Sequence, residues 1–233
     1  TTYFSGSARG FCVTIAERLR RFLNADGPAP RGKRRAGTSG ALSAPTATWT
    51  AQDFAFEAEL KRRLGSRYVG FTGQGYANRY GGGFVYRPRG AAVRTYILHH
   101  TAGAQSDTGA NLWRYHVQTR GWDTDGYHVV VRVDGSVELL IPPSLMSYGA
   151  AQHNPYTVHV SVPGNYVAQS PAPALLSSVY QVFLALDAAY GGKPWRGHKE
   201  IMNTACPGGL LPHLAKMRGP QYGAASPPRP SYP

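Results

Sequence analysis

The stretch VRTYILHH, residues 93–100, is the strongest strand signal in this chain of 233 residues. It is rich in apolar and β-branched side chains and ends in two histidines. Side chains placed where a rigid strand opens into a loop are well positioned for catalysis or metal binding. Because neighbouring side chains on a strand point to opposite faces, only one of His99 and His100 can easily face a given site.

The segments that follow predict the rest of an α/β fold. Residues 127–141, YHVVVRVDGSVELLI, are typical of two strands joined by a tight turn at Asp134-Gly135, and residues 156–164 predict another strand. Three segments have the apolar spacing of helices: 109–121, 173–192 and 210–219. Strands interleaved with helices predict a mixed central β-sheet flanked by helices.

A further helix is expected before this region, from about residue 52 to residue 64. Thr50 and Asp53 have the spacing of a capping box, and Gly65 is a typical stop. Four apolar residues are predicted to form the buried side of this helix: Phe54, Phe56, Leu60 and Leu64.

Residues 1–90 are predicted to form a basic, partly irregular N-terminal extension. It holds this helix and another at 13–24, separated by a Pro-, Gly- and Ser-rich linker at 25–48. The Gly- and Tyr-rich segment 65–90 is expected to be irregular. The chain beyond it divides into two parts: a domain at 91–219 and a Pro-rich tail at 220–233.

The positive charge is concentrated in the first part of the chain. The formal net charge is +13; residues 1–90 carry 15 Lys or Arg against 5 Asp or Glu, and residues 91–233 carry 10 against 7. Such a field attracts polyanions, which include nucleic acid, anionic lipid and anionic cell-wall polymer, but a solvated basic face fits the same composition. A nucleic-acid binder would rest on this charge alone, because the sequence holds none of the usual recognition motifs.

The sequence gives no sign of a membrane span, a secretory signal or a disulfide framework. The longest apolar runs fall well short of 18 residues, and the apolar stretch near the N-terminus is broken by Glu17 and Arg18. Two cysteines are too few for a disulfide scaffold, although a single bond between Cys12 and Cys206 stays open.

The segment HKEIMNTAC, residues 198–206, contains the second candidate group for chemistry. A histidine and a cysteine at loop-like spacing suit Zn²⁺, and His99 or His100 would supply a third ligand. Three protein ligands leave a fourth position for water, which is the layout of a catalytic zinc site. Taken singly, the same residues also fit two core histidines and a buried cysteine.

Three motifs together resemble one enzyme family. YILHHTAG (96–103), RGWDTDGYHVVVRVDGSVE (120–138) and GHKEIMNTACPG (197–208) occur in the order found in the zinc N-acetylmuramoyl-L-alanine amidases. That family contains phage type 2 amidases and the peptidoglycan recognition proteins. The resemblance extends over residues 91–218 and implies the family's fold, a mixed sheet flanked by helices.

The resemblance also implies a set of site residues. One zinc ion per chain would be held by three ligands: His99, His198 and Cys206. Tyr127, in the motif GYH, would assist catalysis, and Thr204 stands where the family often has a lysine, so that a hydroxyl would face the oxyanion in place of a cation. Two residues are the candidates for substrate contact: His100 and Asn154.

The implied activity is hydrolysis of the lactyl amide bond between N-acetylmuramic acid and L-alanine in peptidoglycan, as in a lytic, endolysin-like enzyme. The alternative is a non-hydrolytic peptidoglycan-binding or structural module in a larger assembly. The expected place of action is the bacterial cell wall. The protein would then be phage-encoded and cytoplasmic before release, carried in a virion, or a mature secreted chain, with an anionic wall polymer as a second partner for its basic N-terminal region.

Overall fold

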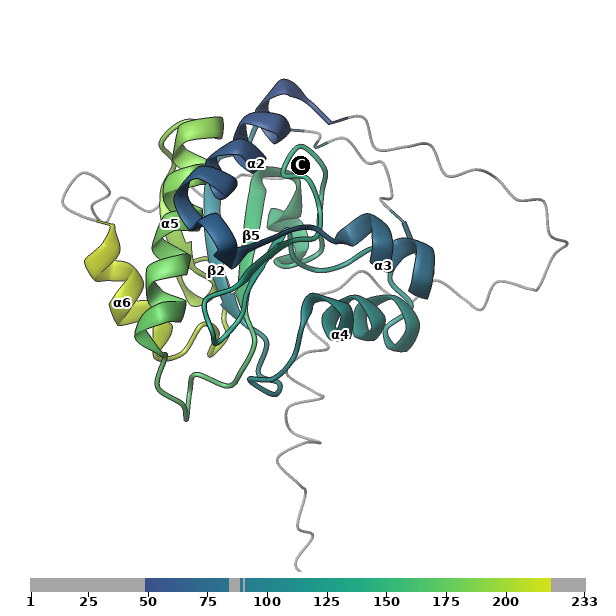
Figure 1. Cartoon of the computed structure of the whole chain (residues 1–233). Coiled ribbons are helices and arrows are strands. Elements are labelled where there is room, and N and C mark those ends of the chain that lie inside the picture. The colour runs from purple at the N-terminus through teal and green to yellow at the C-terminus, as the bar shows by residue number, and fades with distance from the viewer. Residues whose placement is uncertain (1–48, 84–88, 90, 219–233) are drawn as a thin grey trace, which may run out of the picture.

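A computed structural model describes residues 49–83, 89 and 91–218 of the chain. The helix predicted at 13–24, the linker at 25–48 and the tail at 220–233 lie outside these residues, as does Cys12. Within the described part, the order of elements confirms the α/β fold with a mixed central sheet (Figure 1).

The sheet has six strands in the order β1-β4-β3-β5-β2-β6. Their bounds are β1 Tyr68–Phe71, β2 Thr95–His100, β3 Val129–Val131, β4 Val137–Leu139, β5 Thr157–Val162 and β6 Trp195–Gly197. Only β3 and β4 pair antiparallel, through the predicted turn at Asp134-Gly135; the other neighbours are parallel. The short strand β6 is a finding of the structure, because three residues are too few to give a periodic signal.

Helices cover both faces of the sheet. Figure 1 shows α2, α5 and α6 on one side and α3 and α4 on the other. The helices are α2 Ala51–Leu64, α3 Gly73–Tyr80, α4 Gly109–Arg114, α5 Pro173–Tyr190 and α6 Leu210–Met217. α4 continues into a π-helical segment, Tyr115–Thr119, and three short 3-10 segments join other elements: Gly65–Arg67, Ala151–Tyr156 and His198–Glu200.

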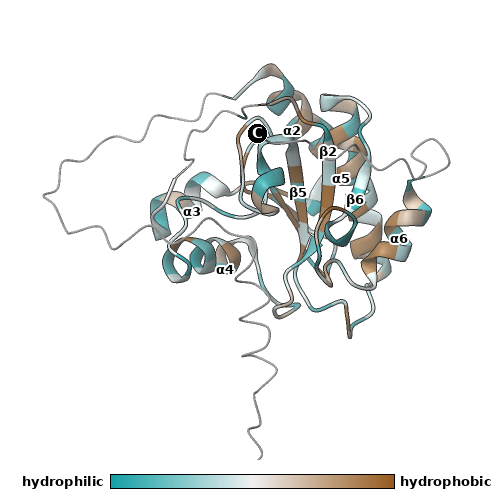
Figure 2. Ribbon diagram, turned by 180° about the vertical axis from the view of Figure 1, so that it is seen from behind, coloured by the Kyte–Doolittle hydropathy of each residue, from teal (hydrophilic) through white to brown (hydrophobic). Residues whose placement is uncertain are grey.

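Each face of the sheet has its own hydrophobic core. On the α2 and α5 side, Tyr96 and Leu98 of β2 pack with the alternate valines of β5. On the α3 and α4 side, Val130 of β3 packs with Leu140 and Trp113. Figure 2 shows hydrophobic residues along β2 and β5. The odd-numbered residues of these two strands face the α3 and α4 side, since Ser161 pairs with both Val130 and His99.

The folded unit begins well before residue 91, which corrects the predicted domain boundary. β1 pairs with β4 along the sheet edge, and α3 follows it, so the segment 65–90 is not irregular throughout. The sequence pattern does not predict this strand, because Gly70 has a φ of 128° and lies at a register shift that breaks the alternation.

α2 is part of the same core rather than of an extension. Its predicted capping box is confirmed: Thr50 Oγ1 accepts from Asp53 N, and Asp53 Oδ2 accepts from Thr50 N at 2.8 Å. Leu60 and its predicted companions Phe56 and Leu64 are buried, whereas Phe54 is 60% exposed, so its assignment to the buried side is wrong. Phe54 lies beside Trp49 instead, with ring centroids 5.2 Å apart.

Candidate metal centre

The parallel strands β2 and β6 bring the predicted ligands to one edge of the sheet. His99 lies near the C-terminal end of β2, and His198 follows directly after β6, the neighbour of β2. The loop that leads from His198 to Cys206 is closed by a hydrogen bond from Lys199 N to Cys206 O at 2.7 Å. All three side chains are buried, and their ligand atoms lie within 4.8 Å of one another. The structure thus brings together the three residues that the motifs predicted.

The spacing of the donor atoms fits a tetrahedral metal ion. His99 Nδ1 lies 3.8 Å from Cys206 Sγ, and the rings of His99 and His198 have centroids 4.5 Å apart. Two ligands at the usual Zn–N and Zn–S lengths, set at a tetrahedral angle, are about 3.5 Å apart. Two imidazoles and one thiolate are also a donor set that Zn²⁺ prefers. The residues present therefore fit zinc without rearrangement of the backbone.

Burial keeps the imidazoles of this site neutral. Burial, and after it the neighbouring His198, holds the pKa of His99 well below its usual range. Burial likewise lowers the pKa of His198 to about 4 and that of His100 to about 4. A neutral imidazole has a lone pair to give to a metal, so both ligand histidines are ready to bind at neutral pH.

The sulfur of Cys206 lies near both backbone groups of His100, and its longer contact is to the His100 carbonyl oxygen, at 3.7 Å. The N–H of His100 donates to Sγ at 3.2 Å, and Thr204 Oγ1 accepts from Cys206 N at 3.2 Å. A backbone donor stabilises a thiolate over a thiol, and the thiolate is the form that binds metal. Cys206 therefore lies in a setting built for coordination.

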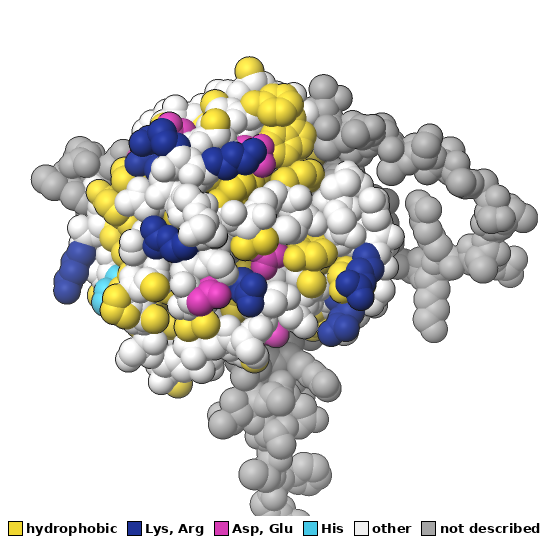
Figure 3. Space-filling view, viewed as in Figure 1, with side chains coloured by type: hydrophobic (Ala, Val, Ile, Leu, Met, Phe, Trp, Pro, Cys, Tyr) yellow, Lys and Arg dark blue, Asp and Glu magenta, His cyan; other side chains and the backbone are white. Residues whose placement is uncertain are grey.

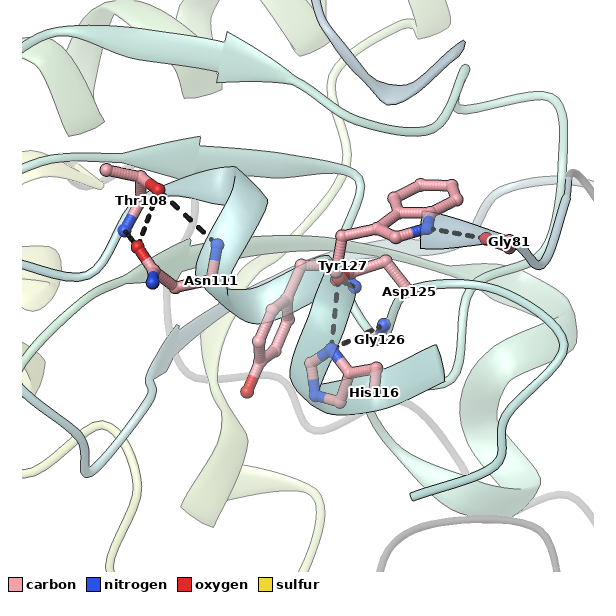
Figure 4. A network of polar contacts seen from close by, with 8 residues as sticks. Gly81, Thr108, Asn111, His116, Asp125, Gly126 and Tyr127 are labelled. Atoms are coloured by element: carbon pink, nitrogen blue, oxygen red, sulfur yellow. Dashed lines mark hydrogen bonds and ion pairs between the residues drawn. The ribbon is translucent and has the colours of Figure 1, made fainter. Parts of the chain in front are cut away.

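Tyr127 lies against this group of ligands, as predicted. Its ring centroid is 5.4 Å from that of His99. Asp125 Oδ1 accepts from Tyr127 N at 2.8 Å, and Asp125 Oδ2 lies 3.1 Å from Nδ1 of His116 (Figure 4). The ring of His116 stacks on Trp122. The buried carboxylate of Asp125 thus fixes the backbone that carries Tyr127.

The remaining predicted residues have partners within the protein. His100 Nδ1 accepts from Tyr166 N at 3.1 Å, so this nitrogen already has a partner within the protein. Asn154 is 5% exposed, and its Oδ1 accepts from Ala150 N at 2.7 Å, closing a turn. Both contacts are made within the protein, and the substrate role of His100 and Asn154 stays a prediction.

Two further residues contact the ligand histidines and were not predicted. His159 Nδ1 lies 3.0 Å from His99 Nε2, and Met202 Sδ lies 3.2 Å from His198 Nε2. The sequence signal for His159 was the alternation of the strand TVHVSV. It places this histidine on a face that otherwise carries Thr157 and Ser161. Met202 gave no such signal, because thioethers in loops are most often packing residues.

Comparison with known proteins finds one matching family model and several relatives. The model of the family described as N-acetylmuramoyl-L-alanine amidase matches residues 89–209. Peptidoglycan-recognition protein SC1a of Drosophila melanogaster is 32% identical over 124 residues, which are 48% of this chain and 66% of that protein. Peptidoglycan recognition protein 1 of Bos indicus is 33% identical over 131 residues, which are 51% of this chain and 68% of that protein.

Among solved structures, the endolysin of Thermus scotoductus bacteriophage Ph2119 is similar over nearly its whole length. It is 27% identical, with a TM-score of 0.57, and the match covers 65% of this chain and 99% of the endolysin. The family match begins at residue 89, so it leaves out residues 1–48, which hold 8 Lys or Arg against 2 Asp or Glu. Of the helices that the structure describes, none has both the length and the apolar character of a membrane span.

Proposed function

The chain belongs to the N-acetylmuramoyl-L-alanine amidase family, and from this premise we propose that it hydrolyses the lactyl amide bond between N-acetylmuramic acid and L-alanine in peptidoglycan. One observation carries the proposal. His99, His198 and Cys206 come from distant parts of the chain and still place their ligand atoms within 4.8 Å of one another.

Zn²⁺ is the proposed cofactor, one ion per chain. His99, His198 and Cys206 would hold it, and the fit of their donor atoms supports this choice. When bound, the ion supplies Lewis acidity, which acidifies water and polarises an amide carbonyl. The remaining chemistry falls to side chains around the ligands.

Tyr127 is proposed to donate a hydrogen bond to the oxyanion that forms as the amide carbonyl is attacked. Its ring lies against His99, and a phenol with a pKa of about 10 is a donor at neutral pH rather than a base. Thr204 is the second proposed donor. Its oxygen accepts from Cys206 N, and its hydroxyl hydrogen remains available to donate. Thr204 would supply a neutral donor where the family often has a lysine.

The proposed partner is peptidoglycan, and the proposed place of action is the bacterial cell wall. The relatives named as peptidoglycan recognition proteins and as an endolysin support both. A lytic role, with the protein phage-encoded or carried in a virion, follows from the endolysin likeness. Binding of an anionic wall polymer is proposed for the basic N-terminal region, residues 1–90, which carries 15 Lys or Arg against 5 Asp or Glu. On the face in Figure 3, basic and acidic side chains are mixed.

The test measures zinc content and the release of L-alanine amino groups from purified peptidoglycan. The full chain should contain one zinc ion and release amino groups, and Tyr127→Phe should keep the zinc and lose most of the release. A chain that binds zinc and peptidoglycan but releases nothing would favour the non-hydrolytic module. A chain that binds no zinc would remove the basis of the proposal.

A further inference from the structure

A row of three buried polar side chains leads to the metal centre along one face of the sheet. Thr157 and His159 belong to β5, and His99 belongs to the adjacent strand β2. Thr157 Oγ1 lies 2.8 Å from His159 Nε2, and His159 Nδ1 lies 3.0 Å from His99 Nε2. Thr157 and His159 are fully buried and His99 is 1% exposed, so each polar atom in the row must find its partner inside the protein.

The hydrogen bonds of this row can be assigned by counting protons. Thr157 has one hydroxyl hydrogen, which it donates to the carbonyl of His153 at 2.8 Å. Towards His159 it can therefore only accept, so the proton of the neutral His159 ring lies on Nε2. Nδ1 of His159 is then a lone pair, which accepts the Nε2 proton of His99.

This assignment leaves Nδ1 of His99 as a lone pair. Nδ1 is the atom that lies 3.8 Å from the Cys206 sulfur, in the metal centre. The direction of every hydrogen bond in the row is thus set at its far end, by the carbonyl of His153, and the result is the tautomer of His99 that a metal requires.

The ring of His159 is held in place by its surroundings. A Cβ added at Gly149 would come within 2.7 Å of His159 Cγ and Nδ1, so the backbone at residue 149 lies flat against the ring. On another side the ring stacks on His128, with centroids 5.6 Å apart and planes inclined by 22°. The ring therefore cannot swing away from His99 without moving the backbone.

We propose that His159 is a positioning residue that fixes the tautomer and the ring orientation of His99, and so presets the centre for a divalent metal. The inference rests on the proposed metal site, and it adds a residue outside the ligand set. An outer partner of a metal-bound histidine is commonly a carboxylate or a carbonyl, both of which only accept. A histidine in this place can accept at Nδ1 only while its proton is on Nε2. Thr157 keeps the proton there by accepting a hydrogen bond from Nε2.

The first test reads the tautomers directly in the wild-type protein. Long-range ¹H–¹⁵N spectra of the metal-free chain should show His99 and His159 both protonated on Nε2. A His99 ring protonated on Nδ1 would overturn the inference. This reading needs no variant and no enzymatic activity.

The second test measures zinc affinity by competition with a fluorescent chelator. His159→Phe keeps the ring shape and removes the acceptor, and it should weaken zinc binding by about 10–100-fold. His159→Asn places an amide oxygen close to the former Nδ1 and should restore most of the affinity. Thr157→Val should also weaken binding, because the His159 proton is no longer confined to Nε2.

Ser161→Ala is the matched control, since Ser161 lies two residues further along the same face of β5 and its buried hydroxyl has no hydrogen-bond partner among the described residues. It should bind zinc as the wild type does. Equal zinc affinity of folded His159→Phe and wild type would overturn the inference, while a wild type that binds no zinc would instead refute the proposed function. If His159→Phe does not fold, Thr157→Val and the wild-type spectra decide.

Discussion

The backbone N–H of His100 donates a hydrogen bond to the Cys206 sulfur at 3.2 Å, although 106 positions separate the two residues in the chain. This contact joins the end of β2 to the loop after β6, and it places a donor where negative charge is needed on sulfur. Cys206→Ser should fold and keep the contact, but a serine hydroxyl is a far poorer zinc ligand than a thiolate. Zinc affinity should fall by more than the 10–100-fold expected for a lost outer partner. Metal analysis after dialysis checks this; stoichiometric zinc in the variant would contradict it.

Replacement of Tyr127 should separate metal binding from turnover. Tyr127→Phe keeps the ring beside His99 and removes the hydroxyl donor. Because a lost oxyanion donor costs about 10²–10³ in turnover, kcat should fall by that order while KM and zinc content stay near wild type. Steady-state kinetics on a soluble muropeptide give the two constants separately, and an unchanged kcat would rule out the donor role.

Thr204 should contribute less than Tyr127, and two variants separate the effect of its hydroxyl from that of its packing. Thr204→Ser keeps both the bond that it accepts from Cys206 N and its own donor hydrogen. Thr204→Val keeps the shape and loses both, so kcat should fall by about 10²-fold, the low end for an oxyanion donor. The serine variant should match the wild type; a serine variant as slow as the valine variant would show that packing, not the hydroxyl, is at work.

The metal-free protein should lose stability as the pH falls from about 6.5 towards 4. Burial lowers the pKa of His198 and of His100 to about 4, below the value of about 6.5 in an unfolded chain. Between these values the unfolded chain binds more protons than the folded one, so the free energy of unfolding rises with pH across this window and levels off above it. Urea unfolding at several pH values in the presence of a chelator measures the slope. His100→Asn should reduce that slope; a profile as steep as the wild type's would contradict the assignment.

The inclusion of α2 in the core can be tested with a pair of substitutions on that helix. Leu60 is fully buried against α5, while Phe54 is 60% exposed. Leu60→Ala should lower the free energy of unfolding of the whole domain by about 2–5 kcal/mol, because it leaves a cavity. Phe54→Ala is the control and should change it by far less. If the two variants unfold alike, α2 does not share the core.

The convergence of the three candidate ligands was easier to predict from the sequence than the limits of the fold. His99, His198 and Cys206 stand in motifs whose order is visible in the chain, so their convergence could be predicted. β1 could not, because Gly70 interrupts the alternation that marks a strand. Phe54 was misplaced for a local reason: an aromatic residue next to a helix start can pack outward on Trp49 as easily as inward.

The role of His159 could not be predicted from sequence because it depends on sheet register. His159 lies opposite Ile97 in β2 and reaches His99 only along the diagonal, a relation between strands that lie 60 residues apart. A slip of one residue in that pairing would turn the ring to the other face of the sheet. The register between β2 and β5 depends on the packing of the whole sheet, so neither strand's sequence alone predicts it.

The pairing of β1 with β4 determines where the protein can be shortened. A fragment cut to the matched residues 89–209 would lack β1, α2, α3 and α6, so β4 would present an unpaired row of N–H and C=O groups to solvent. At the same time the face of α5 that packs on α2 would be exposed to solvent. Such a fragment should precipitate even with its ligands intact, and the shortest piece worth expressing starts at Trp49 and runs through Arg218.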